Sequence, residues 1–222
     1  MIKRILLDID DVCNRFTMTA LHYVGCRIDP MQYTSFPPEC QFDIVCAANK
    51  LLGYERFNVS DFWEHIPRKF WANAPPSAEF PLLIGWCESL VGQENVCLLT
   101  SPTIDPDCLA GKLEWIHQFA PRWLHRQYLV GPCKQFAAHP EALLIDDSDK
   151  NVNKFRSWGG QAVLVPRPWN TNHALNTMEH LAHAFELLHE AKREALERQF
   201  LDEQPMLREQ LREPQAAEWG PP

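Results

Sequence analysis

A short apolar run near the start of the chain ends in a cluster of carboxylates, and this feature constrains the fold most. Residues 5–7 have the apolar pattern of a buried strand, and Asp8, Asp10 and Asp11 follow directly. Asp8 and Asp10 point the same way on an extended backbone, and a carboxylate is costly to bury without a cation. The pattern predicts a strand end that holds a hard cation such as Mg²⁺. A strand followed by a solvated acidic loop is the alternative.

Four further apolar runs predict the rest of a sheet. Helical patterns separate them, which is typical of an α/β fold with a largely parallel sheet flanked by helices. The predicted strands cover residues 96–99, 127–130, 142–145 and 161–165, and the helices between and before them cover residues 80–90, 109–119 and 151–158.

Polar side chains follow the predicted strands, and a parallel sheet brings the carboxyl ends of its strands to one edge, where ligands bind. The residues expected to meet there are Asp8, Asp10, Thr100, Ser101, Lys134, Asp146 and Asp147. Acids that hold Mg²⁺, together with a hydroxyl and an amine that hold anionic oxygens, are the groups needed for phosphoryl transfer. The sequence has no glycine-rich phosphate loop, which disfavours a P-loop nucleotide hydrolase.

The charge balance argues against a polynucleotide partner. The formal net charge is −8, so a general basic surface is not expected, and a small phosphate ester is the favoured partner. No stretch of the sequence is apolar enough over the length needed to span a membrane. The first predicted strand begins at the very start of the chain, which leaves no room for a signal peptide. We therefore expect a cytoplasmic protein.

The cysteines also favour a reducing compartment. Eight cysteines are scattered along the chain and none forms a CxxC pair; they stand at positions 13, 26, 40, 46, 87, 97, 108 and 133. Several lie inside apolar strand or helix patterns. We interpret them as reduced thiols of the core, and not as a disulfide framework or a zinc site.

These motifs resemble those of the haloacid dehalogenase (HAD) superfamily of Mg²⁺-dependent phosphatases. The four signatures stand in order as Asp8-Ile9-Asp10-Asp11-Val12, Thr100, Lys134 and Asp146-Asp147. Within the superfamily the chain is most similar to the 5′(3′)-deoxyribonucleotidases. That similarity rests on Phe16, Thr100-Ser101-Pro102, residues 112–116, residues 143–147 and Pro168-Trp169-Asn170. It covers about residues 1–175.

The resemblance implies a division of the chain. Residues 1–16 and 77–175 would form a Rossmann-like HAD core, and residues 17–76 would form a small helical cap, called the insert below. Residues 176–201 carry apolar side chains at helical spacing and predict an amphipathic C-terminal helix. This helix packs either on the body or on a second subunit, so a homodimer is an open expectation. Residues 202–222 are rich in proline and charge and are predicted to be disordered.

The resemblance also implies roles for the acids. Asp8 would be the nucleophile that forms an aspartyl-phosphate. Asp10 would protonate the leaving hydroxyl and then activate water. Mg²⁺ would be held by Asp8, by the backbone carbonyl of Asp10 and by Asp146 or Asp147, and the sequence leaves the choice between these two open.

Three further residues would hold the phosphate. Thr100 would bind a phosphate oxygen, and Ser101 would assist through its hydroxyl or its backbone. Lys134 would neutralise the phosphate and the nucleophile together, because without it the crowded anions would repel the substrate.

A second lysine lies on the helix predicted over residues 109–119. Leu109, Leu113 and Ile116 recur on one face of this helix, whereas Lys112 falls on the face expected to meet water. We therefore favour Lys134 for the phosphate site and keep Lys112 as its rival.

Two residues depart from the pattern of the resembled family. Asp11 stands where glycine usually follows the second acid, and Pro132 stands where a basic residue usually precedes the lysine by two positions. Both departures bear on substrate preference more than on the chemistry, because they add a charge beside the phosphate site or remove one.

Aromatic residues of the insert can form a slot over the phosphate site. The candidates are Phe16, Phe62, Trp63, Phe70 and Trp71. Stacking of a base on an aromatic ring contributes roughly 1–3 kcal/mol, which favours nucleotides over sugar phosphates. The alternative is that these rings form the apolar core of the insert itself.

The sequence thus predicts a Mg²⁺-dependent phosphoric monoester hydrolase. The first hypothesis is a nucleotidase that acts on nucleoside monophosphates, with deoxyribonucleoside 5′-monophosphates favoured by the resemblance. The second is a phosphatase for another small phosphate ester or for a nucleic-acid 3′-phosphate. The third is a HAD-like binding protein without catalysis, which the presence of both Asp8 and Asp10 disfavours.

Overall fold

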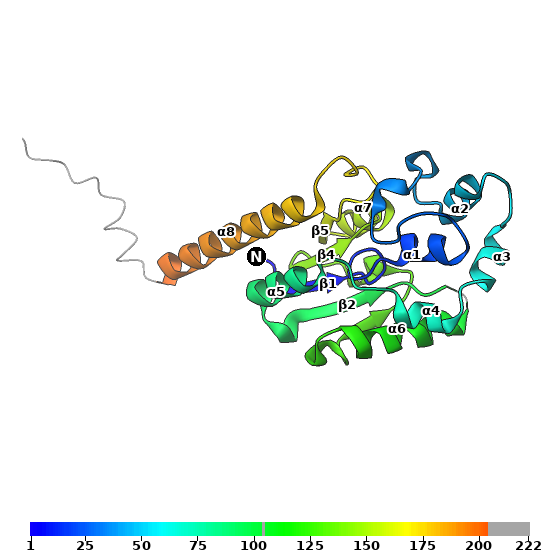
Figure 1. The fold of residues 1–222 in the computed structure, drawn as a ribbon. Coiled ribbons are helices and arrows are strands. Elements are labelled where there is room, and N and C mark those ends of the chain that lie inside the picture. Colours follow the sequence, from blue (N-terminus) through cyan, green and yellow to red (C-terminus); the bar gives the residue numbers. More distant parts are fainter. Residues whose placement is uncertain (104, 204–222) are drawn as a thin grey trace, which may run out of the picture.

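The structure is a computed structural model that describes residues 1–103 and 105–203. Within these residues one five-stranded sheet forms the centre of the molecule (Figure 1). The strands pair in the order β3-β2-β1-β4-β5, and every pair is parallel. The strands are β1 (Arg4–Leu7), β2 (Val96–Thr100), β3 (Tyr128–Val130), β4 (Ala142–Asp146) and β5 (Gln161–Leu164). The predicted α/β class with a parallel sheet is confirmed.

Helices flank this sheet. In the body they are α5 (Phe80–Val91), α6 (Pro106–Phe119), α7 (Asp149–Ser157) and α8 (Thr177–Glu203), and in the insert α1 (Phe16–Tyr23), α2 (Ile44–Leu52), α3 (Val59–Glu64) and α4 (Arg68–Asn73). Short 3₁₀ turns lie at Tyr33–Ser35, Pro38–Cys40, Gln93–Asn95, Arg122–Leu124 and Lys134–Ala137. Helix α5 packs against β1 and β2, α7 packs against β4 and β5, and α4 packs along α6.

The register of the central strands decides where the acids lie. Leu7 of β1 is level with Leu98 of β2 and with Ile145 of β4. These three side chains are fully buried, as expected for parallel strands covered on both faces. The next backbone amide, that of Asp8, donates to the carbonyl of Ile145 at 3.0 Å. The ends of β1 and β4 therefore lie side by side, and the acid that follows each strand reaches the same edge.

The chain enters and leaves the insert through a paired segment. The amide of Arg15 donates to the carbonyl of Pro75, and the amide of Ser77 donates to the carbonyl of Cys13, both at 2.9 Å. The hydroxyl of Ser77 donates to the carbonyl of Val12 at 2.8 Å. The insert builds an apolar cluster of its own, with Met18, Leu21 and Phe62 among its fully buried members. Burial of this cluster beside α6 holds the insert over the carboxyl edge of the sheet.

The expectation that all cysteines are reduced was wrong for two of them. Cys40, at the end of the Pro38–Cys40 turn, forms a disulfide with Cys46 in the first turn of α2, with a Cα–Cα distance of 5.6 Å. This separation lies in the range that a disulfide spans. The other six cysteines are free, and four of these, Cys13, Cys26, Cys87 and Cys108, are buried as expected of core thiols.

The C-terminal helix α8 begins on the body and extends away from it (Figure 1). Its first half buries Leu181 and Phe185, and the ring of Phe185 lies 5.6 Å from that of Trp86 on α5. Further along, Leu196 and Phe200 are exposed. The helix continues to Glu203, so the predicted disorder of residues 202–222 is wrong for its first two residues, and residues 204–222 lie outside the described part of the chain. No helix among the described residues is long and apolar enough to cross a membrane.

Close packing of α4 on α6 leads to a first prediction. A Cβ added at Gly111 of α6 would lie 2.4 Å from Trp71 Cβ and 2.6 Å from the carbonyl oxygen of Arg68. We expect Gly111→Ala to lower the free energy of unfolding by about 1–3 kcal/mol, because backbone must move to admit the methyl group. Urea unfolding measures this change.

Gly85 on α5 provides the matched control. A Cβ there meets nothing within 4 Å, so Gly85→Ala is expected to raise the free energy of unfolding by roughly 0.5–1 kcal/mol through helix propensity alone. Equal effects of the two alanines would contradict the close approach of α4 to α6.

Candidate active site

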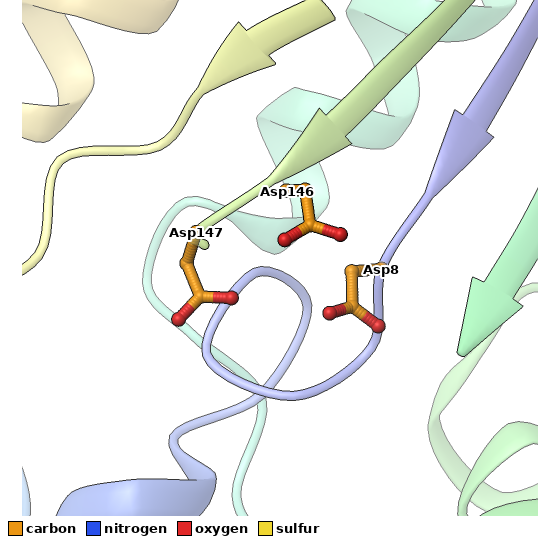
Figure 2. Close-up of side chains that lie close together, drawn as sticks. All are labelled: Asp8, Asp146 and Asp147. Carbon is orange, nitrogen blue, oxygen red and sulfur yellow. The ribbon is translucent and has the colours of Figure 1, made fainter. Parts of the chain in front are cut away.

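Three buried carboxylates meet at the carboxyl ends of β1 and β4. Asp8 follows β1, Asp146 ends β4 and Asp147 comes next in the chain (Figure 2). One oxygen from each carboxylate lies within 4.8 Å of one oxygen from each of the others. The sequence places them together because each acid follows an apolar strand, and the parallel register aligns the two strand ends.

One lysine bridges two of these acids. The Nζ atom of Lys134 lies 2.7 Å from Asp8 Oδ2 and 2.6 Å from Asp146 Oδ2, and the side chain is 2% exposed. Burial alone would lower the pKa of this lysine, but the two carboxylates outweigh it and hold the pKa above its ordinary value. Lys134 is therefore a fixed cation between the two acids.

The third acid, Asp147, forms no ion pair with a lysine or arginine of the described residues. Asp147 Oδ2 accepts one hydrogen bond, from Trp169 Nε1 at 2.8 Å. Burial raises the pKa of Asp147 well above its usual range, and the charges of Asp146, Asp11 and Asp8 raise it further. Burial also raises the pKa of Asp146, against the opposing effect of Lys134. When all three carboxylates are ionised, the cluster therefore carries more negative charge than Lys134 balances.

This excess of negative charge fits a divalent cation. Mg²⁺ prefers carboxylate oxygens, and a cation among three carboxylates would favour their ionised forms. The residues present, Asp8, Asp146 and Asp147, match both the donor chemistry and the spacing of such a site. Asp10 does not belong to this cluster through its side chain, and only its backbone carbonyl remains as its predicted contribution to a metal.

A second lysine enters the site from helix α6. Lys112 is 2% exposed, and its Nζ atom lies 2.6 Å from Asp10 Oδ2. The same ammonium donates to Thr100 Oγ1 at 2.8 Å and to the Ser101 carbonyl at 2.7 Å. The prediction that Lys112 faces water was therefore wrong, as was the burial expected of Leu109, which is exposed. The site holds both lysines, each with its own set of oxygens.

Asp10 is oriented separately from Asp8. Its Oδ2 pairs with Lys112, and its Oδ1 accepts a hydrogen bond from Asn14 Nδ2 at 3.2 Å. Asp8 Oδ1 instead accepts from the amide of Ile9 at 2.8 Å, while its Oδ2 pairs with Lys134. Asp8 and Asp10 thus pair with different lysines, which gives the two acids distinct electrostatic surroundings.

Asp11 has the backbone conformation that glycine favours. Its φ is 56°, in the left-handed region. Its carboxylate accepts hydrogen bonds from Thr17 Oγ1 at 2.6 Å and from the Thr17 amide at 3.1 Å. Burial raises the pKa of Asp11 to about 7, and the hydrogen bond from Thr17 opposes this rise. The side chain therefore ties the acid loop to the start of the insert.

A cavity of about 600 Å³ opens above the acids. Asp8, Asp10, Asp11 and Asp147 line it, together with Ser101, whose hydroxyl donates to the carbonyl oxygen of Gly131 at 3.4 Å. Thr100, Lys134 and Asp146 are buried and do not line it. Lys134 therefore reaches the cavity lining through its ion pair with Asp8, and Lys112 through its ion pair with Asp10.

Aromatic rings line the cavity on one side. Phe16 stacks on Trp71, with ring centroids 4.3 Å apart, and lies 6.1 Å from Trp63. All three line the cavity, and Phe16 and Trp71 are also buried members of the apolar cluster of the insert, to which Phe62 and Phe70 belong without lining the cavity. Phe16 and Trp71 are therefore compatible with both alternatives considered from the sequence, whereas Phe62 and Phe70 are compatible only with the apolar core.

A second group of rings was not predicted for the cavity. Phe36, Phe42 and Trp169 also line it, with Phe36 5.0 Å and Phe42 6.3 Å from the ring of Trp169. Trp169 follows β5 in the chain, whereas the two phenylalanines come from the insert. Trp169 was noted only for the resemblance, and no local pattern signals that rings so far apart in sequence meet.

Comparisons with known proteins return only remote structural likenesses. No protein-family model matches the sequence, and no curated protein is significantly similar to it. The chain is similar to a HAD family hydrolase from Deinococcus radiodurans solved with bound phosphate and sodium, at 15% identity and a TM-score of 0.46, over 81% of this chain and 88% of the other. It is also similar to a haloacid dehalogenase-like protein of unknown function from Agrobacterium tumefaciens, at 11% identity and a TM-score of 0.49, over 83% of this chain and 90% of the other. A HAD family enzyme from Bacteroides thetaiotaomicron, in complex with magnesium and inorganic phosphate, gives 12% identity and a TM-score of 0.36, over 79% of this chain and 100% of the other. Likenesses at this level assign neither a family nor an activity.

The charge excess at Asp147 leads to a prediction about metal binding. A buried acid with a raised pKa destabilises the metal-free protein as the pH rises through that pKa, because the unfolded chain loses its proton at lower pH. In EDTA at pH 8 we therefore expect Asp147→Asn to be more stable than the wild type, by on the order of 1 kcal/mol. Added Mg²⁺ should stabilise the wild type by binding the folded state, and should stabilise Asp147→Asn far less.

Thermal unfolding with EDTA and with Mg²⁺ measures both effects. Asp107→Asn, which changes an exposed acid of α6, is the control and should respond to Mg²⁺ as the wild type does. An equal Mg²⁺ shift in wild type and Asp147→Asn would show that Asp147 takes no part in holding the ion.

Proposed function

We propose that this protein is a Mg²⁺-dependent phosphatase that hydrolyses a nucleoside monophosphate, with a deoxyribonucleoside 5′-monophosphate as the favoured substrate. One observation carries the proposal: Asp8 lines the cavity, pairs with Lys134 and lies within 4.8 Å of Asp146 and Asp147. A carboxylate held between a cation and a candidate metal site suits nucleophilic attack on an anionic phosphorus centre.

The chemistry divides between the two acids. A carboxylate oxygen of Asp8 forms a bond to phosphorus as the bond from phosphorus to the leaving oxygen breaks, and Asp10 gives a proton to that oxygen. In the second half Asp10 takes a proton from water as the water oxygen bonds to phosphorus and releases Asp8. Lys112 and Asn14 hold Asp10 for these transfers.

The two lysines neutralise charge in different places. Lys134 offsets Asp8 and Asp146, so that a dianionic phosphate can approach the nucleophile. Lys112 donates a hydrogen bond to Thr100 Oγ1 and forms an ion pair with Asp10. It therefore lies near the place where negative charge develops on the leaving oxygen. Mg²⁺, held by Asp8, Asp146, Asp147 and the Asp10 carbonyl, would supply further stabilisation of charge on the phosphate oxygens.

The aromatic walls favour a planar leaving group. Phe16, Trp63 and Trp71 line one side of the cavity, and Phe42 with Trp169 lines another. Stacking of one base on such rings contributes roughly 1–3 kcal/mol, so a nucleoside gains more from this cavity than a sugar phosphate. Preference for deoxyribose and for the 5′ position rests on the resemblance to deoxyribonucleotidases.

Removal of either acid tests the reaction. We expect Asp8→Asn to lower kcat for all phosphate monoesters by at least about 10³-fold, since the nucleophile is lost. Asp10→Asn should reduce nucleotide hydrolysis far more than the first-step release of p-nitrophenolate from p-nitrophenyl phosphate, because that leaving group needs no proton. A panel of nucleotide and sugar monophosphates, assayed with Mg²⁺ and with EDTA, measures these changes. Full activity of Asp10→Asn on nucleotides would overturn its acid–base role.

The aromatic wall gives a prediction about specificity. Trp63 is half-buried and lines the cavity, so Trp63→Ala should raise KM for nucleotides about tenfold through lost stacking, with little change for p-nitrophenyl phosphate. Trp158→Ala, which removes an exposed tryptophan packed on Phe136, is the matched control. An equal loss with every substrate would instead assign Trp63 to the apolar core of the insert.

A further inference from the structure

One carboxylate connects the acid loop to both aromatic sides of the cavity. Asp11 lies next to Asp10 and accepts hydrogen bonds from the amide and the hydroxyl of Thr17. Its Oδ1 also lies 3.3 Å from the hydroxyl of Tyr33, which donates to it. Thr17 is in α1 directly after Phe16, and Tyr33 begins the 3₁₀ turn that leads to Phe36. Asp11 is therefore connected to one ring of each group: to Phe16 through its neighbour Thr17, and to Phe36 through Tyr33, three residues earlier.

Arg167 also binds the acid loop, through the backbone of Asp11. Its Nε atom donates to the carbonyl of Asp11 at 2.7 Å, and its guanidinium lies 4.6 Å from the centroid of the Tyr33 ring. Arg15 lies 5.3 Å from the same centroid. Arg167 also pairs with Glu79 and is 2% exposed. Two guanidinium groups thus lie near the Tyr33 ring while its hydroxyl donates to Asp11.

The position of Asp11 in the loop separates its backbone role from its side-chain role. A φ of 56° is available to glycine at no cost, and the resembled family usually has glycine at this place. The backbone therefore does not need a carboxylate here. The carboxylate is buried, which is unfavourable unless its hydrogen bonds have a use, and all of its hydrogen-bonding partners described here belong to the insert.

We propose that Asp11 is a positioning residue that sets how the two aromatic sides of the cavity lie over Asp8 and Asp10, acting through Thr17 and Tyr33. This inference rests on the proposed phosphatase function and adds to it a determinant of substrate selection. Asp11 holds the rings in place for a substrate with a large leaving group. A small ester that does not reach the rings depends on this contact much less.

The test compares two substrates of different size. The ratio of kcat/KM for a nucleoside 5′-monophosphate to kcat/KM for p-nitrophenyl phosphate is measured in each variant. We expect Asp11→Gly, which keeps the left-handed backbone, to lower this ratio about tenfold, and Tyr33→Phe to lower it about threefold. Thr17→Val should lower it, and Thr17→Ser should restore it, because serine keeps the hydroxyl that donates to Asp11.

Tyr23→Phe is the matched control, since it removes an exposed hydroxyl from a tyrosine of the same insert. Equal losses with both substrates in Asp11→Gly, or an unchanged ratio in both Asp11→Gly and Tyr33→Phe, would overturn the inference. A ratio that falls equally in Thr17→Val and Thr17→Ser would do the same.

A second measurement does not depend on activity and separates this inference from the proposed function. Hydrogen exchange of the backbone amides should become faster in Asp11→Gly over α1 and the Tyr33–Ser35 turn, and stay unchanged in β4. If the wild type hydrolyses no phosphate ester, the proposed function fails, and this exchange pattern still decides whether Asp11 fixes the insert. Unchanged exchange over both segments would show that it does not.

Discussion

The crowding of acids at the ends of β1 and β4 is the constraint on which the rest of the structure depends. Asp8, Asp146 and Asp147 are buried within reach of one another, and such an arrangement is costly without cations. The surrounding chain supplies them, because the segment after β3 brings Lys134 to Asp8 and Asp146. Helix α6 brings Lys112 to Asp10 on the other side. The positions of this segment and this helix therefore determine which cations offset the charge of the acids.

The sheet and its acids are predictable from sequence because their signals are local. Each strand is a short apolar run, and each acid follows such a run directly, so the parallel arrangement alone brings Asp8 beside Asp146. Lys134 could be placed near the acids for the same reason, since it follows β3. The parallel topology aligns these residues, so their positions can be predicted without knowledge of side-chain packing.

Features that depend on contacts between distant segments could not be predicted in this way. Helical periodicity placed Lys112 toward water, but α6 is covered by α4, which approaches closely at Gly111. A helix with two covered faces does not show one apolar stripe, so its buried lysine and the exposed Leu109 both contradict the periodicity. The Cys40–Cys46 disulfide and the meeting of Phe42 with Trp169 likewise require knowledge of how the insert folds.

The assignment of a separate lysine to each acid has a chemical consequence. If a single cation served both Asp8 and Asp10, a change in the protonation of one acid would directly alter the other. Here Lys134 pairs with Asp8, whereas Lys112 pairs with Asp10 and also binds Thr100. Two carboxylates in different surroundings can take different roles, which is what the proposed reaction requires of Asp8 and Asp10.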